Sequence, residues 1–390
     1  MDRPWYRSFE WPLAIACVLI TLIGIVCIAS ATSHSALASG EAKKQIAYAL
    51  CGIALMAGFA FVDYRRWQRL ALPLYIVMLV LLAFILVKGN GSHGAIRWIA
   101  LGPFQFQPSE PAKLIVAIAI AALLARGSFA RIQDLWMPLL AVALPALLVL
   151  KQPDLGTALV LVAILTAQLY FGLPNLLDFA IYVVTGVVAA LYVIGSDKIL
   201  KPFQKARLLV FLDPKLDPQG SGYSLNQSKI AVGNGGLFGK GLYHGTQTQL
   251  NFVPEHSTDF IFTVLGEELG FIGAVVLLTL YAVVLACGVR AMYAARDRFG
   301  FLLAGGLVAM IFFHILVNVG MTVGIMPITG IPLPFMSYGG SAILTDYAAI
   351  GILLNIAMQR DKLIFEAPGE PERPRIGRKA LKTPTRAVLR

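Results

Sequence analysis

Charged residues are scarce in this sequence. Asp, Glu, Lys and Arg make up 14% of the 390 residues, whereas a soluble domain contains about 25%. Hydrophobic residues reach 58%, above the usual range of roughly 45–50%. This composition excludes an ordinary cytosolic enzyme. It also excludes a disordered chain, because disorder requires low hydrophobicity and dense charge. A membrane protein with several spans remains.

Residues that bind metals are also few, with four cysteines and five histidines. The cysteines lie inside apolar runs and lack the CxxC spacing of a zinc site or the pattern of a disulfide framework. The histidines are scattered and form no HExxH motif. We therefore predict no metal site from these residues.

Long apolar runs are abundant, and each must form a helix because lipid offers no partner for backbone amides. Ten crossings would use about 200 residues, which the chain can supply. The sequence predicts an all-α polytopic membrane protein, a bundle of about ten transmembrane helices with a long extracytoplasmic loop (196–259) between helices 7 and 8. The runs cover 11–33, 45–62, 70–87, 111–126, 135–150, 155–173, 176–195, 260–288, 300–325 and 339–358.

The excess of 32 Lys and Arg over 21 Asp and Glu would suggest nucleic acid in a soluble protein. Here the basic residues cluster in short connections on one side, which predicts that both termini are cytoplasmic and that nucleic acid is not a partner. We predict a transmembrane domain over 1–363 and a disordered basic cytoplasmic tail over 364–390 that lies against anionic lipid. The longer external segments indicate that the chemistry is on the outer face.

Ionisable residues at membrane depth are costly and are therefore functional candidates. Glu110 and Lys113 stand three residues apart at the start of the fourth helix, where Ser109 is a suitable N-cap. They form either a structural ion pair or a lysine aimed at an anionic ligand. Lys151 and Asp154 place a base and an acid in one tight external turn, which suggests a site.

The long loop combines basic residues with many glycines between Gly220 and Gly241, a composition that could cradle phosphates. At its end, Asp259 in the segment Pro254–Phe262 is expected to cap the eighth helix and to stay ionised, which also suits a general base. Glu267 and Glu268 lie further along that helix, and we expect them to be structural.

The chain resembles the SEDS family (shape, elongation, division, sporulation), most closely its elongation type, over residues 11–363. The most specific segments include GGLFGKG at 235–241, HGTQ at 244–247, TDFIF at 258–262 with Glu267 and Glu268, and GIPLPFMSYGGS at 330–341. One departure is Ser257, which stands where the family usually has histidine directly before the Thr-Asp pair.

The resemblance implies an inverting peptidoglycan glycosyltransferase that polymerises lipid II, as donor and acceptor, on the outer face of the bacterial inner membrane. It implies a class B penicillin-binding protein and other elongation-complex proteins as partners. Asp259 matches the family's essential aspartate, and Glu110 and Lys113 match its acid and base pair. Other motif positions are Trp98, Asp154, Gln204 and Arg207.

As a mechanism, we expect Asp259 to take the proton from the acceptor hydroxyl while cations hold the leaving diphosphate. The cations are Lys113, Lys151, Arg207 and Lys229; further predicted substrate contacts are Glu110, Trp98, Arg97, Asp154, Gln204 and Ser337. No cofactor is predicted with certainty, and a divalent cation, Mg²⁺ or Mn²⁺, is left open. The alternatives are a transporter that flips a lipid-linked precursor and a scaffold that only positions a penicillin-binding protein.

Overall fold

The computed structural model describes residues 9–33, 40–88, 90–92, 95–102, 104–127, 132–196, 207–208, 210–211, 213, 217, 220–250 and 252–359. The predicted tail over 364–390 lies outside this part of the chain.

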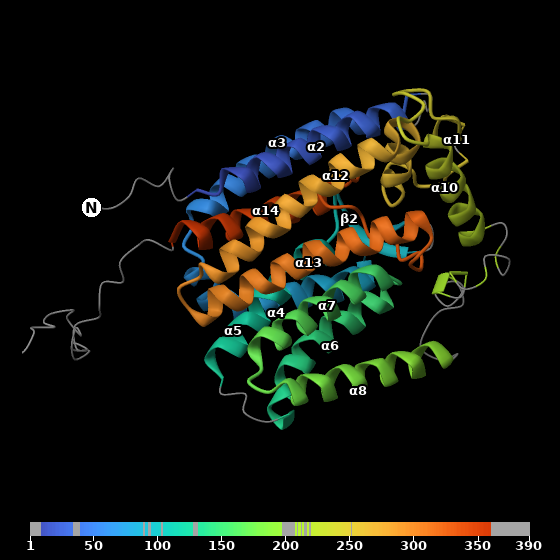
Figure 1. Ribbon diagram of the computed structural model, residues 1–390. Helices are drawn as coiled ribbons and strands as arrows, with labels where there is room; N and C mark the ends of the chain where they lie inside the picture. The colour runs from blue at the N-terminus through green and yellow to red at the C-terminus, as the bar shows by residue number, and fades with distance from the viewer. Residues whose placement is uncertain are drawn as a thin grey trace, which may run out of the picture.

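Ten long helices run roughly along one direction in the described residues (Figure 1). Eight of them are long and apolar enough to cross a membrane. The other two are α5, whose 18 residues include three charges, and α6, which has 16 residues. The prediction of about ten transmembrane helices is confirmed. The helices are α2 (Trp11–Ala31), α3 (Glu41–Phe61), α4 (Arg65–Lys88), α5 (Ser109–Arg126), α6 (Trp136–Lys151), α7 (Leu155–Gly172), α8 (Leu176–Gly195), α12 (Ile261–Tyr293), α13 (Arg298–Val323) and α14 (Gly340–Met358).

Smaller elements gather at one end of the bundle, opposite the start of α2 and the end of α14 (Figure 1). The connection between α4 and α5 forms an antiparallel sheet of β1 (Asn90–Ser92), β2 (Ala95–Leu101) and β3 (Phe104–Phe106). The long connection between α8 and α12 contains α10 (Ser221–Gly235) and the single turn α11 (Thr246–Gln249). The sequence analysis predicted neither the sheet nor these two helices.

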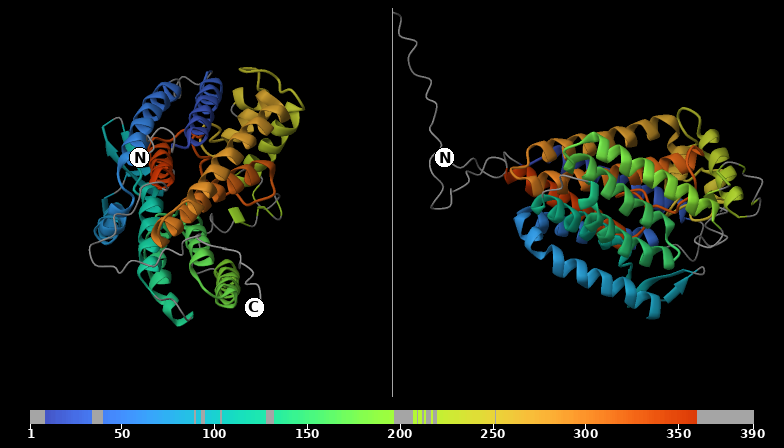
Figure 2. Two further views of the ribbon diagram at one scale, coloured as in Figure 1. Left: turned by 60° about the vertical axis from the view of Figure 1, so that its left-hand side comes forward. Right: turned by 90° about the horizontal axis from the view of Figure 1, so that it is seen from below.

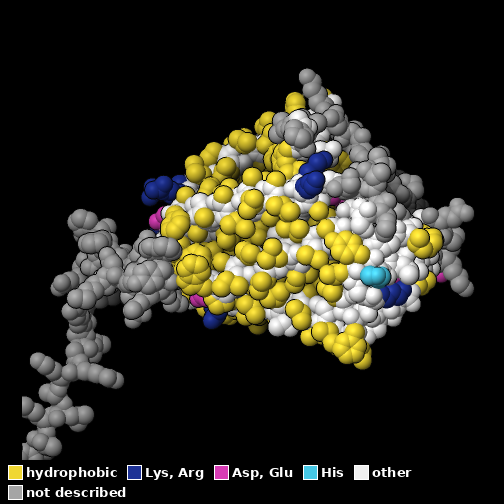
Figure 3. Space-filling model, turned by 90° about the horizontal axis from the view of Figure 1, so that it is seen from above, with side chains coloured by type: hydrophobic (Ala, Val, Ile, Leu, Met, Phe, Trp, Pro, Cys, Tyr) yellow, Lys and Arg dark blue, Asp and Glu magenta, His cyan; other side chains and the backbone are white. Residues whose placement is uncertain are grey.

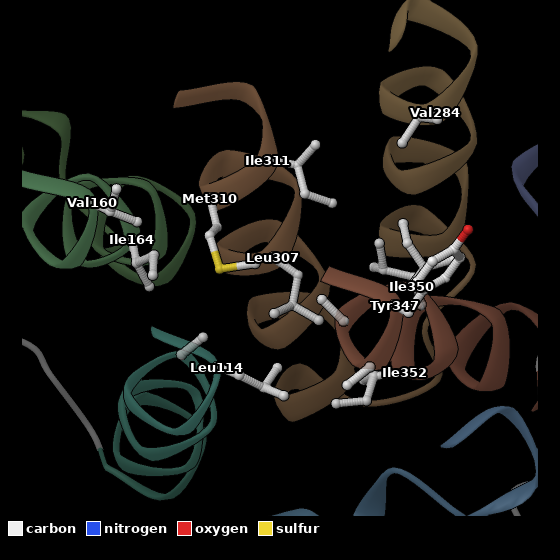
Figure 4. Close-up of a cluster of buried hydrophobic side chains, with 14 of the residues drawn as sticks. Leu114, Val160, Ile164, Val284, Leu307, Met310, Ile311, Tyr347, Ile350 and Ile352 are labelled. Carbon is white, nitrogen blue, oxygen red and sulfur yellow. The ribbon is translucent and has the colours of Figure 1, made fainter. Parts of the chain in front are cut away.

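The core is built on α13, whose neighbours include α5, α7, α12 and α14. Leu307 and Met310 of α13 are fully buried, and they lie near Ile164 of α7 and Leu114 of α5 (Figure 4). Helix α8 differs, because none of its residues is buried and it lies at the edge of the bundle (Figure 2). Seen from above, hydrophobic side chains form a broad band across the molecule, with the few charged side chains at its margins (Figure 3). Such a band is what a lipid bilayer requires of the protein surface.

Candidate functional site

Asp259 directly precedes Phe260, the residue before α12, at the end of the bundle that carries the smaller elements. The N-cap of α12 is Phe260, and no side chain makes a capping bond, so the prediction that Asp259 caps this helix is wrong. Instead, its backbone carbonyl accepts a hydrogen bond of 2.8 Å from Nδ2 of the buried Asn318 on α13. The same Nδ2 donates to the carbonyl of Ile331 at 2.7 Å. Asn318 therefore holds the residue before α12 against the loop 326–339.

The carboxylate of Asp259 and the guanidinium of Arg207 both lie close to Gly330. A Cβ atom placed on Gly330 would lie 3.1 Å from Oδ2 of Asp259 and 3.6 Å from Nη1 of Arg207. The φ angle of Gly330 is +72°, in the region that favours glycine. Because Gly330 has no side chain, there is room beside its backbone for both the carboxylate of Asp259 and the guanidinium of Arg207.

Burial raises the pKa of Asp259 to about 6, and the nearby negative charge of Glu255 adds to the rise. The positive charges of Arg207 and Arg97 act in the opposite direction. No hydrogen bond to the carboxylate of Asp259 is found among the described residues, although the side chain is half-buried. A carboxylate with a pKa near the operating pH and no fixed partner can accept and release a proton.

Ser337 reaches the same region through the backbone. Its hydroxyl donates to the carbonyl of Thr258 at 2.6 Å and accepts from the backbone N–H of Leu333 at 2.8 Å. The N–H of Tyr338 also donates to the carbonyl of Ser257 at 2.9 Å. These bonds give Ser337 a structural role beside Asp259, whereas its predicted contact with substrate stays a prediction.

The turn between α6 and α7 also contributes a charge that acts on Asp259. The side chain of Asp154 is the N-cap of α7, accepting from the N–H of Thr157 at 3.1 Å and from its hydroxyl at 2.9 Å. Nε of Arg97, on β2, donates to the carbonyl of Gln152 at 3.1 Å, and Nη2 donates to the carbonyl of Pro153. Since the charges of Arg97 and Asp154 both act on Asp259, β2 and this turn belong to its surroundings.

Lys113 is buried rather than directed at an opening. Its side chain lies 2.7 Å from Oε2 of Glu110 and 2.9 Å from Nε2 of His314, and both Lys113 and Glu110 are at most 4% exposed. The Nδ1 atom of His314 lies 2.7 Å from the carbonyl of Met310, which can only accept. The proton is therefore on Nδ1, and Nε2 accepts from the Lys113 ammonium. His314 is a partner that the sequence analysis did not identify.

Ser109 does not cap α5, since the N-cap is Pro108 and no side chain makes a capping bond. Its hydroxyl instead lies 3.5 Å from Oδ2 of Asp154, and Nε2 of Gln107 lies 3.4 Å from the same atom. The start of α5, with Glu110 and Lys113, is thereby joined to the turn that faces Asp259.

Part of the glycine-rich segment packs closely against α12. The backbone N–H groups of Lys240 and Gly241 donate to the carbonyls of Glu267 and Glu268, both at 3.0 Å. Gly239 contacts the backbone of α12 so closely that a side chain there would collide with the carbonyl of Glu268. Close backbone approach therefore explains Gly235 and Gly239, whereas no described atom lies within 4 Å of a Cβ placed on Gly233 or Gly236, and the suggested phosphate cradle stays a prediction.

Glu267 and Glu268 are structural, as expected. Both are fully buried. Glu267 accepts from the N–H groups of Gln247 and Thr248, at 2.9 and 3.1 Å, and Glu268 accepts from the hydroxyl of Ser30 on α2 at 2.6 Å. These bonds fix α11 and α2 to the outer part of α12.

The remaining predicted site residues lie apart from Asp259 or have no described contact with it. Lys229 is exposed and lies over Gly324, at the C-terminal end of α13, where a cation is favourable. Lys151 is the exposed last residue of α6, and Trp98 is half-buried on β2. Gln204 lies outside the described residues.

The described residues offer few side chains that could bind a metal ion together. Within the part of the chain that the structure describes, no group of three or more His, Cys, Asp or Glu side chains could hold a metal ion. We therefore assign no step of the reaction to a metal.

Comparison with known proteins identifies the family. Residues 11–362 match the model of the cell cycle protein family that includes FtsW, RodA and SpoVE. The chain belongs to this family. It is a multi-pass membrane protein, and the resemblance deduced from the sequence motifs is confirmed.

Relatives within the family extend over most of the chain. The peptidoglycan glycosyltransferase MrdB of Escherichia coli K12 is 41% identical over 325 residues, which cover 83% of this chain and 87% of MrdB. A chain of a peptidoglycan synthase complex, solved for its coordination of polymerization and crosslinking, is 32% identical with a TM-score of 0.78, covering 91% of this chain and 99% of that one. RodA of Thermus thermophilus is 30% identical with a TM-score of 0.66, covering 92% and 100%.

The Glu110–Lys113 pair gives a first prediction. Glu110→Ala should lower the free energy of unfolding by about 3–5 kcal/mol, because it leaves a buried ammonium without its counter-charge. The double variant Glu110→Ala, Lys113→Met should recover most of this loss, because no lone charge remains buried. Thermal unfolding of both variants in detergent measures the difference.

The double variant also separates the two interpretations of Lys113. If the pair is only structural, the stable double variant keeps its activity. If Lys113 acts on an anionic ligand, the double variant folds but is inactive. A double variant less stable than Glu110→Ala would contradict the energetic argument.

Proposed function

We propose that this chain is a peptidoglycan glycosyltransferase that polymerises lipid II into glycan strands, on the outer face of a bacterial inner membrane, during cell elongation. The observation that carries the proposal is Asp259, a half-buried acid with a pKa raised to about 6, beside Arg207 at the outer end of the bundle. The activity named for its relatives supports the same conclusion.

The reaction needs a base and a stabiliser of negative charge. Ionised Asp259 takes the proton from the sugar hydroxyl of the acceptor as that oxygen attacks the anomeric carbon of the donor. The bond from that carbon to the diphosphate breaks, and the diphosphate leaves with the electron pair. Arg207 and Arg97 lie on the same side as Asp259 and stabilise the negative charge that develops on the leaving group. A single displacement inverts the anomeric centre and needs no second carboxylate.

We further propose a class B penicillin-binding protein as partner, together with other elongation-complex proteins. The support is the similar chain from a synthase complex in which polymerization and crosslinking are coordinated. Both termini are proposed to be cytoplasmic. Arg65, Arg290 and Arg298 lie at the helix ends opposite Asp259, as the positive-inside rule requires of the cytoplasmic side. A requirement for Mg²⁺ or Mn²⁺ stays a prediction, which assays with and without EDTA test.

The proposal is tested by Asp259→Asn. This variant should keep its fold and lose polymerisation of purified lipid II by at least about 10²-fold, since a positioned base contributes about 10²–10⁴-fold. The assay is done in detergent, where there are not two membrane sides, so that a transporter would give no glycan. Thr279→Ala, on the exposed surface of α12, is a matched control that should remain active.

Two results would contradict the proposal. If wild-type protein forms no glycan from lipid II with or without its partner, the chain is not the polymerase. If Asp259→Asn polymerises as fast as wild type, another group is the base.

The pH dependence gives a further prediction. Asp259 must be ionised to accept a proton, so kcat/KM should fall about tenfold per pH unit below about 6. Glu255→Gln removes a negative charge and should move this acid limb to lower pH. Arg207→Gln removes a positive charge and should move it to higher pH. Rates of polymerisation from pH 4.5 to 8 measure the midpoints, which should move in opposite directions whatever the maximal rates. Shifts in the same direction would exclude Asp259 as the titrating group.

A further inference from the structure

An apolar groove runs between the outer halves of α4 and α6, on the surface that faces lipid. Its volume is about 430 Å³, within the range of roughly 300–1,000 Å³ that is usual for sites of small ligands. Lys151 is the one charged side chain among the seven described residues that line it. The others are Leu79, Val80, Ala83, Leu144, Leu147 and Leu148.

Hydrogen bonds fix both ends of the groove. Towards the cytoplasm, the hydroxyl of Tyr75 on α4 donates to the carbonyl of Ala141 on α6 at 2.9 Å. At the outer end, Nε2 of the buried Gln152 donates to the carbonyl of Leu82 at 2.9 Å. Ten residues from Ala141 to Lys151 correspond to about 15 Å of helix at about 1.5 Å per residue. The groove is therefore a preformed apolar channel with a cation at its outer end.

Arg97 connects this outer end to Asp259. It donates hydrogen bonds to the carbonyls of Gln152 and Pro153, the two residues that follow Lys151. Its positive charge also acts on Asp259. Lys151 makes no ion pair within the described part of the chain, so its ammonium is available to an anion. A molecule with its apolar part in the groove would place its head between Lys151 and Arg97.

We propose that this groove holds the isoprenoid chain of a polyprenyl diphosphate, the lipid part of the donor, with Lys151 binding the diphosphate next to Arg97. The inference rests on the proposed function and adds a donor site to it. Apolar contact alone would not select this ligand, because the tails of ordinary lipids are equally apolar. Charge distinguishes the polyprenyl diphosphate from ordinary lipids. A diphosphate carries more negative charge than a phospholipid phosphodiester, and here it would lie between Lys151 and Arg97.

The test uses the whole protein in nanodiscs with a polyprenyl diphosphate that bears a diazirine in its first isoprene units. Mass spectrometry of the irradiated protein should locate the label on residues 79–83 and 144–151. Unlabelled polyprenyl diphosphate should reduce this labelling by more than fivefold, and the same concentration of phosphatidylglycerol should not. Equal competition by phosphatidylglycerol, or a label located elsewhere, would overturn the proposal.

Matched variants make the test specific. Ala83→Phe fills the groove and should reduce labelling at least fivefold and raise the KM for lipid II. Ala189→Phe, an equivalent change at an exposed position of α8, should leave both unchanged. Lys151→Gln should remove the preference for diphosphate over phosphatidylglycerol. Normal labelling in Ala83→Phe would overturn the proposal.

The outcomes of this experiment distinguish an error in the donor site from an error in the proposed function. If wild-type protein polymerises lipid II but the label avoids the groove, the donor site is wrong and the activity stands. If the groove is labelled with the expected preference but no glycan forms in detergent, the site stands as a lipid diphosphate site and the polymerase assignment is wrong.

Discussion

A charge inside the membrane must have a partner, and this constraint decides which groups of the bundle are fixed and which can react. Lys113 has both Glu110 and His314, and Glu267 is held by two backbone N–H groups. Breaking such a buried pair leaves an uncompensated charge, which is strongly unfavourable. Asp259, at the membrane edge, is different. The positive charges that act on it belong to Arg207 and Arg97, and no described hydrogen bond joins its carboxylate to either arginine. Asp259 is therefore an acid that is able to exchange a proton.

The ten helices could be predicted because length and apolarity are local properties of the sequence. The extra helix α10 could not, since its sequence SGYSLNQSKIAVGNG has no apolar stripe. It packs on α12 through small residues, of which Gly235 meets the backbone of Gly266. The sheet β1–β3 was missed for a similar reason, because two of its three strands have only three residues, which carry too little alternation to detect.

The candidate site could be predicted only where its signal was local or lay in a recognised motif. Glu110 and Lys113 are three residues apart, so helix geometry pairs them, whereas His314 is 201 residues from Lys113 and joins them only in the fold. Asn318, which holds the backbone of Asp259, was missed for the same reason. The composition of the glycine-rich loop could not decide its role, because glycine permits both an exposed anion cradle and a close backbone approach.

The position of the arginines links donor binding to the strength of the base. In the free protein, Arg207 and Arg97 lower the pKa of Asp259 and so weaken it as a base, although burial and Glu255 outweigh them. A diphosphate bound between Lys151 and Arg97 would offset the charge of Arg97 and bring negative charge closer to Asp259. Both effects raise the pKa of the carboxyl group, because they disfavour its ionised form. Asp259 would then accept a proton more readily when the donor is in place, and after the diphosphate leaves, the arginines would again favour release of that proton to water. Arg97 would thus both stabilise the leaving group and help to reset the base.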